Sequence, residues 1–185
     1  MTDHGTFDGP MPSRYELTGE TLAIECGVIV HRIRAIVDIP LHGVTAGDEG
    51  GYVESIMLKD GSARVSGSAW VSGSARVSGS AWVSGSARVS DSARVEKPWH
   101  LLLVGPIGSE EVTATLSRTK GDKHILNVGC WTGTLGTLSA EVKRRRLLWT
   151  ADDATQAVWT AQYKALNRLG KATVARWESD GEVFS

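Results

Sequence analysis

The stretch from Gly61 to Glu96 reads GSARVS, GSAWVS, GSARVS, GSAWVS, GSARVS, DSARVE, which is six copies of one six-residue unit without a gap. A period of six matches neither the two-residue side-chain period of a strand nor the 3.6-residue period of a helix. It matches a short strand followed by a corner, repeated, which is the signature of a hexapeptide β-helix. The sequence therefore predicts a short parallel β-helix over residues 61–97.

Each position of the unit has a role in such a coil. The valines are expected to point inward from the flat faces, and the alanines to fill the tight interior near the corners. The glycines fall at turns, where their backbone freedom is useful. The inward positions are Val65, Val71, Val77, Val83, Val89 and Val95, with Ala63, Ala69, Ala75, Ala81, Ala87 and Ala93.

Three units make one triangular turn of about eighteen residues, so each outward side chain lies under the one a turn later. This register forms three pairs: Arg64 with Trp82, Trp70 with Arg88, and Arg76 with Arg94. Turns lie about 4.8 Å apart, so two faces carry an arginine stacked on a tryptophan. These ladders either cover the coil or form an adhesive face, since Trp and Arg are enriched at binding hot spots. The coil resembles the left-handed form of the fold.

Length, charge and composition limit the partners and the cellular compartment that the chain is expected to have. The chain has 185 residues and a formal net charge of −1, so nothing in the overall charge favours membrane or duplex nucleic acid as a partner. It has no run of eighteen apolar residues and no secretion signal at its start, so we expect a soluble protein of the cytoplasm. Cys26 and Cys130 form no zinc pattern and are expected to be buried free thiols. No metal and no cofactor is expected.

The flanks of the repeat should form separate units. Residues 1–14 are expected to be a flexible tail, residues 15–60 a β-rich N-terminal cap, and residues 98–185 an α+β domain, so the fold class is mainly β. The thirty-six repeat residues make only about two turns, and such a stack buries its faces only against neighbours. We therefore expect caps and a homo-oligomer, with a trimer first and a dimer second.

Local patterns predict elements within the flanks. YELTG, TLAIE and VIVHRIRAIVDI are expected strands of the cap, followed by Tyr52, Ile56 and Leu58 as irregular residues. HLLLVGPIG, EVTATLSRT and HILNVGCWTG are expected strands of the C-terminal domain. A helix is expected from about Leu138 to Trp149, capped by Thr137 or Ser139, and a second from Asp152 or Asp153 to Gly170. The apolar stripe expected on that second helix contains Val158, Gln162, Ala165, Leu166 and Leu169.

The motifs around the repeat also resemble a known family. The order YELTGET, HRIRAI, AGDEGGYVE, hexapeptide units, GPIGS and VGCWTGTL is similar to that of uncharacterised phage and prophage proteins, from Tyr15 to about Arg146. The resemblance implies a phage origin but no mechanism. The residue after GPIGS is commonly basic in that family, whereas here it is Glu110. Because the number of repeat units varies among members, the resemblance implies that the β-helix is a spacer or platform and the flanks hold the specific surface.

Hexapeptide β-helices are best known as acyltransferases, which resemble one another in a His general base between neighbouring prisms. A histidine suits this role because its pKa is near neutrality. The candidates are His31, His42, His100 and His124, and none lies inside the coil. Two turns are also too few for a long coenzyme groove, so an enzyme is the alternative and not the leading hypothesis.

Three further motifs could carry chemistry. Gly105, Gly108 and Ser109 of GPIGS could present N–H groups to a phosphate, or simply form a rigid turn. Cys130 would need a base, and His124 lies roughly 20 Å away at about 3.3 Å per strand residue, which favours a structural thiol. The run that contains Arg144 and Arg145 either complements the helix dipole or forms an anion-binding patch.

These observations favour a non-catalytic phage protein that binds a host component. Counter-defence by holding a host protein, or a small anionic ligand such as a signalling nucleotide, is its most concrete form. An acyltransferase-like enzyme and a virion structural part are the alternatives. The expected binding residues are Arg64, Trp70, Arg76, Trp82, Arg88, Gly105, Gly108, Ser109, Arg144 and Arg145.

Overall fold

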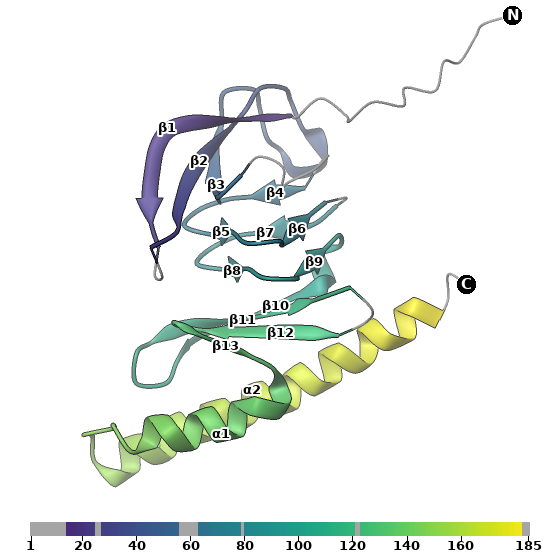
Figure 1. Cartoon of the computed structure of the whole chain (residues 1–185). Coiled ribbons are helices and arrows are strands. Elements are labelled where there is room, and N and C mark those ends of the chain that lie inside the picture. The colour runs from purple at the N-terminus through teal and green to yellow at the C-terminus, as the bar shows by residue number, and fades with distance from the viewer. Residues whose placement is uncertain (1–13, 25–26, 56–62, 79, 121–122, 183–185) are drawn as a thin grey trace, which may run out of the picture.

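The computed structural model describes residues 14–24, 27–55, 63–78, 80–120 and 123–182. It is mainly β, with two helices at the C-terminal end. Figure 1 shows three layers stacked along one axis: an N-terminal sheet, a set of very short strands, and a second sheet covered by the two helices. Within the described residues, no helix is both long enough and apolar enough to span a membrane.

The repeat forms a coil of two-residue strands. These strands are β4 (Arg64–Val65), β5 (Trp70–Val71), β6 (Arg76–Val77), β7 (Trp82–Val83), β8 (Arg88–Val89) and β9 (Arg94–Val95). Each pairs in parallel with the strand three units later, β4 with β7, β5 with β8 and β6 with β9. The predicted register, in which each residue stacks on the one eighteen positions later, is therefore confirmed. Backbone hydrogen bonds join the turns, as from Arg64 N to Ala81 O at 2.8 Å.

The interior of the coil has the predicted composition. Its six valines are at most 1% exposed and its six alanines are fully buried. At the corners, Gly67, Gly73 and Gly85 have φ values of 67°, 65° and 65°. Asp91 stands in the corresponding place of the sixth unit with φ of 55°. Aspartate is one of the few residues that tolerate this left-handed conformation, so the sixth corner keeps the same backbone without glycine.

The N-terminal sheet continues into the coil. Strands β1 (Tyr15–Ala23) and β2 (Ile29–Ala35) are antiparallel, and β3 (Glu49–Val53) pairs with β2. Strand β3 also pairs in parallel with β5, so that Tyr52 lies opposite Trp70. The expectation that Tyr52 is an irregular cap residue is therefore wrong, because GGYVE follows the same rung geometry as the repeat.

Two details of this sheet differ from the sequence prediction. YELTG and the first three residues of TLAIE belong to one strand, β1, in which the pairing register shifts between Leu17 and Thr21. Gly51 is required by close packing, since a Cβ there would lie 2.6 Å from Ala69 O. A short 3₁₀ helix, η1 (Pro40–His42), connects β2 to β3. Ile56 and Leu58 lie outside the described residues.

The C-terminal sheet closes the other end of the coil. It contains β10 (Leu101–Ile107), β11 (Val112–Arg118), β12 (His124–Val128) and β13 (Trp131–Gly133), which are antiparallel in this order, after the 3₁₀ helix η3 (Pro98–His100). Side chains replace the missing next turn: Arg88 N donates to Thr115 Oγ1 at 3.1 Å, and Asn127 Nδ2 donates to Ser90 Oγ at 3.0 Å. The prediction of a single strand over HILNVGCWTG is wrong, because a turn with Gly129 at φ 61° divides it.

Helix α1 (Leu135–Arg146) begins three residues before the predicted start. Its N-cap is Thr134, which forms a capping box with Thr137. Thr134 N donates to Thr137 Oγ1 at 2.9 Å, and such reciprocal bonds satisfy donors that the first turn leaves unpaired. Thr137 therefore lies inside the first turn and is not the cap.

Helix α2 (Asp153–Glu182) does not end at Gly170 as predicted. A Cβ at Gly170 would lie 2.6 Å from Leu135 Cδ2, so this glycine allows α2 to approach α1 and does not stop the helix. The predicted apolar stripe is also partly wrong, because Val158 and Leu169 are 56% and 50% exposed. The buried stripe is instead Tyr163, Leu166, Val174 and Trp177.

Candidate functional site

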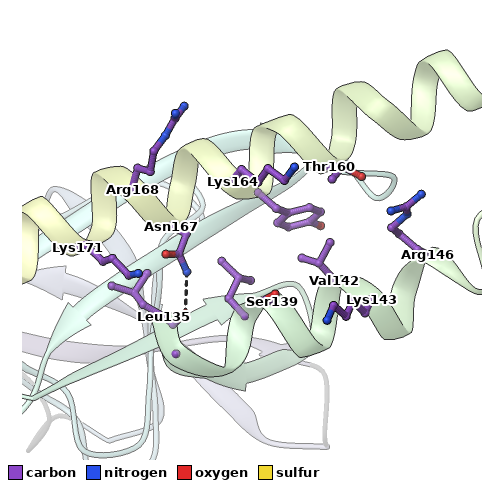
Figure 2. Close-up of a pocket in the computed structure, with 13 residues that line it drawn as sticks. Leu135, Ser139, Val142, Lys143, Arg146, Thr160, Lys164, Asn167, Arg168 and Lys171 are labelled. Carbon is purple, nitrogen blue, oxygen red and sulfur yellow. Dashed lines mark hydrogen bonds between the residues drawn. The ribbon is translucent and has the colours of Figure 1, made fainter.

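A groove of about 590 Å³ runs between α1 and α2 (Figure 2). Its floor is aliphatic and contains Leu135, Leu138 and Val142 of α1. The capping box at Thr134 fixes where α1 begins, and Asn167 Nδ2 of α2 donates to Leu135 O at 2.7 Å. The two helices are thus held in a defined position, and the groove is a fixed feature of the surface.

Cationic side chains from both helices line the groove. They are Lys143 and Arg146 of α1 and Lys164, Arg168 and Lys171 of α2. All five are exposed, and no carboxylate lines the groove within the described part of the chain. None of the five forms an ion pair with another described residue. The groove therefore combines an apolar floor with a strongly positive rim.

Sequence reasoning found only the α1 half of this rim. The α2 cations recur at intervals of four and three residues, at positions 164, 168 and 171, which is the spacing of one helix face. This signal was present in the sequence. Lys164 and Arg168 lie within the helix predicted to end at Gly170, whereas Lys171 joins their row only because α2 continues past this glycine.

Arg144 and Arg145, the residues expected to form an anion-binding patch, lie apart from the groove. Both pair with Glu141, Arg144 Nε at 2.8 Å from Oε2 and Arg145 Nε at 2.7 Å from Oε1. Arg145 is only 5% exposed and also donates to Val128 O at 2.9 Å. The expected patch is therefore wrong for Arg145, whose guanidinium joins α1 to the sheet, whereas Arg144 remains at the surface.

The buried carboxylate of Glu141 makes stability depend on pH. Hydrogen bonds from Arg144, together with Arg145, hold the pKa of Glu141 at about 2, although burial raises it. A lowered pKa stabilises the folded state above the ordinary value of 4.5, and this contribution is lost as pH falls toward 2. We expect urea unfolding, followed by circular dichroism, to show decreasing stability across this range.

Glu141→Gln tests the origin of this acid sensitivity. The variant should be less stable at pH 7, because it leaves the buried Arg145 without its nearest counter-ion, and it should lose much of the decline below pH 4.5. Glu178→Gln, which changes an exposed carboxylate on α2, is the matched control. Equal pH dependence of Glu141→Gln and the parent protein would contradict this assignment.

The predicted arginine–tryptophan ladders are confirmed. Arg64 lies over Trp82 at 5.2 Å and Arg88 over Trp70 at 5.7 Å from the ring centroids. Both arginines also bind backbone carbonyls outside the coil: Arg64 donates to His42 O at 2.7 Å, and Arg88 donates to a carbonyl in the β12–β13 turn at 2.9 Å. The ladders thus fasten the coil to its two caps, although Trp82 is still 48% exposed.

The GPIGS segment forms the end of β10 and the start of the turn that follows it: Gly105 lies in the strand, and Gly108 and Ser109 lie in the turn, which packs against α2. Gly108 N donates to Gln162 Oε1 at 2.9 Å, so this N–H is already used. A Cβ on Gly108 would overlap the Tyr163 hydroxyl, and a Cβ on Gly105 would lie 2.8 Å from Thr113 Cα. Both glycines are therefore explained by close packing, which supports the rigid turn. Ser109 is exposed beside it.

The histidine and cysteine candidates have other surroundings. Cys130 is exposed in the β12–β13 turn, so the prediction of a buried thiol is wrong for it, and Cys26 lies outside the described residues. His124 Nε2 accepts from Leu135 N at 3.1 Å, and burial lowers the pKa of this histidine. His100 is 1% exposed. The described residues that line the groove include no histidine, neither these two nor His31 and His42.

The described ranges contain no group of three or more His, Cys, Asp or Glu side chains that could hold a metal ion. Comparison of the chain with protein-family models, with curated proteins and with solved structures finds no match. The groove and its charges are therefore the features of the molecule that bear on its function.

Proposed function

We propose that this protein is a non-catalytic binding protein that holds an acidic, amphipathic segment of a partner protein in the α1–α2 groove. The observation that carries the proposal is the set of five cations, without a counter-ion among the described residues, around an aliphatic floor. An occupant with carboxylates on one side and leucine-like residues on the other would match both features. A helix laid into an apolar groove is a common mode of peptide recognition.

The lining favours a polypeptide over a nucleotide at this site. A nucleotide base is usually held by an aromatic face, whereas the described lining of the groove has three aliphatic residues on its floor and one aromatic residue, Tyr163. The floor is formed by branched aliphatic side chains, which suit leucine or isoleucine of a partner. Helix α1 has 12 residues, or about 18 Å at 1.5 Å per residue, which matches an occupant of about three turns.

The biological setting is supported by the resemblance of the flanking motifs to phage and prophage proteins. We propose that the partner is a host protein, that binding takes place in the host-cell cytoplasm, and that it serves counter-defence by sequestration. In this proposal the stacked strands form a left-handed β-helix that acts as a rigid platform. The parallel pairing at eighteen-residue intervals and the buried valines support that geometry.

A designed peptide tests the proposal directly. A fluorescein-labelled, sixteen-residue helix with Leu at positions i, i+3, i+4 and i+7 and Glu elsewhere should bind, as measured by fluorescence anisotropy. Binding should weaken as salt is raised, because the rim charges are exposed. The same peptide with Gln in place of Glu should bind at least tenfold more weakly, a difference of about 1.4 kcal/mol.

Charge reversal on the protein locates the binding site. Arg168→Glu should weaken binding of the acidic peptide at least tenfold, about 1.4 kcal/mol. Lys123→Glu makes the same charge change at an exposed position outside the groove and should change affinity less than twofold. Equal binding of the Glu and Gln peptides, or equal effects of the two variants, would refute the proposal.

A further inference from the structure

The third face of the coil breaks the pattern of the other two. The outward residues of the six units run Arg, Trp, Arg, Trp, Arg, Arg. With eighteen residues per turn, the third face therefore places Arg76 directly opposite Arg94. Like charges at directly opposed positions are destabilising. A tryptophan at position 94 would have made a third arginine–tryptophan ladder, so the charge at this position has a structural cost.

The C-terminal sheet brings more cations to the same place. A hollow of about 460 Å³ lies where the third face meets the end of β11. Its lining residues are Arg76, Ser78, Arg94, Glu96, Arg118, Thr119 and Lys120. Among these described lining residues, four are cationic and one is a carboxylate. Neither Arg94 nor Lys120 has a counter-ion within the described part of the chain.

Part of this cluster is positioned from the interior. Arg118 Nη1 lies 3.5 Å from Nε2 of His100, which is 1% exposed. His100 Nδ1 accepts from the backbone N of Glu96 at 3.3 Å, so Nε2 carries the ring proton and Arg118 lies beside the ring without a hydrogen bond to it. Arg94 is half-buried, and Thr119 is 7% exposed. The Arg118 side chain thus lies beside a buried ring, and the backbones of Arg76 and Arg94 are fixed by the pairing of β6 with β9.

We propose that this hollow binds an oxyanion with several negative charges, of the polyphosphate class. Arginine forks match the geometry of phosphate oxygens, and charge-assisted bonds of this kind are stronger than neutral ones. The hydroxyls of Ser78 and Thr119 can donate further bonds. None of the described residues that line the hollow is aromatic, so a nucleotide would be recognised by its phosphate chain and its base would contribute little. The site is separate from the α1–α2 groove.

Isothermal titration of the full-length protein with inorganic triphosphate, ATP and adenosine tests this site. Triphosphate should bind, with an affinity that falls as salt is raised. Equal affinity for ATP assigns recognition to the phosphate chain alone, and tighter binding of ATP identifies a nucleotide as the source of the phosphates. Absence of triphosphate and ATP binding, or adenosine binding as tight as ATP, would overturn the proposal.

Two variants keep the test independent of folding. Arg94→Trp restores the alternation of the repeat, so the coil should remain folded by circular dichroism while triphosphate affinity falls at least tenfold. Lys120→Ala, at an exposed position, should lower affinity about threefold or more. Arg168→Glu, in the α1–α2 groove, should leave triphosphate binding unchanged. The groove proposal and the hollow proposal can therefore each be refuted without refuting the other. Unchanged affinity in both Arg94→Trp and Lys120→Ala would refute the site.

Discussion

Val77→Asp is expected to abolish cooperative folding of the coil. Val77 is fully buried and pairs with Val95 inside the stack, so a carboxylate at this position would lie in the hydrophobic core of the coil. A buried charge without a partner costs several kcal/mol, which is comparable with the total stability of a domain, about 5–15 kcal/mol. Thermal unfolding by circular dichroism should show a melting temperature lower by at least about 10 °C, or no transition at all.

The neighbouring residue supplies a matched control. Arg76→Asp introduces the same carboxylate one position earlier in strand β6, on an exposed side chain. It also removes one member of the opposed arginine pair, so the melting temperature should change by no more than a few degrees. If Val77→Asp melted at the same temperature as Arg76→Asp, the inward placement of the valines would be wrong.

The second large effect is expected at Trp177. This side chain is fully buried near the C-terminal end of α2, and its Nε1–H donates to the carbonyl of Trp99. Trp177→Ala should lower the free energy of unfolding by about 3–5 kcal/mol, as for other large-to-small changes in protein cores. The midpoint of urea unfolding, followed by circular dichroism, measures this change.

Two further variants separate packing from hydrogen bonding. Trp177→Phe keeps an aromatic ring but removes the N–H donor, so it should cost less than Trp177→Ala by at least about 1 kcal/mol. Glu178→Ala changes the adjacent exposed residue and should have little effect. If Trp177→Ala were as stable as Glu178→Ala, the part of α2 beyond Gly170 would not be docked on the protein.

The coil was predictable because its pattern is repeated six times. A single valine in a short apolar run is ambiguous, but a valine at the same place in every unit can only belong to one repeated environment. The pairs across turns then follow from counting, as Arg64 with Trp82 shows. The pairing of β3 with β5 could not be predicted in the same way, because GGYVE lacks the Gly-Ser-Ala sequence that begins most of the other units.

The flanks were less predictable because their decisive contacts lie far apart in the chain. Gly170 reads locally as a helix stop, and only Leu135, thirty-five residues earlier, shows that the glycine is needed for close packing. Arg145 reads as one charge in an exposed run. Glu141 at the i−4 position was a usable signal of its pairing, but burial against the sheet was not.

Only the α1 side of the candidate groove could be predicted from a local sequence pattern. The cations of α1 stand out as a run, whereas those of α2 are separated by apolar residues and become one row only on a continuous helix. The proposed polyphosphate hollow combines residues of the coil, which are paired by the eighteen-residue register, with residues at the end of β11. No local sequence pattern shows that these two segments meet.

The eighteen-residue register gives the number of repeat units a geometric meaning. Each unit carries the chain through a third of a turn, so inserting one unit would rotate the helical end by about 120° relative to the N-terminal sheet. Inserting three units would restore the original angle and only lengthen the molecule by about 4.8 Å. Gain or loss of a single unit therefore changes the direction that the α1–α2 groove faces around the axis of the coil. Three directions are possible, and no residue of the groove needs to change.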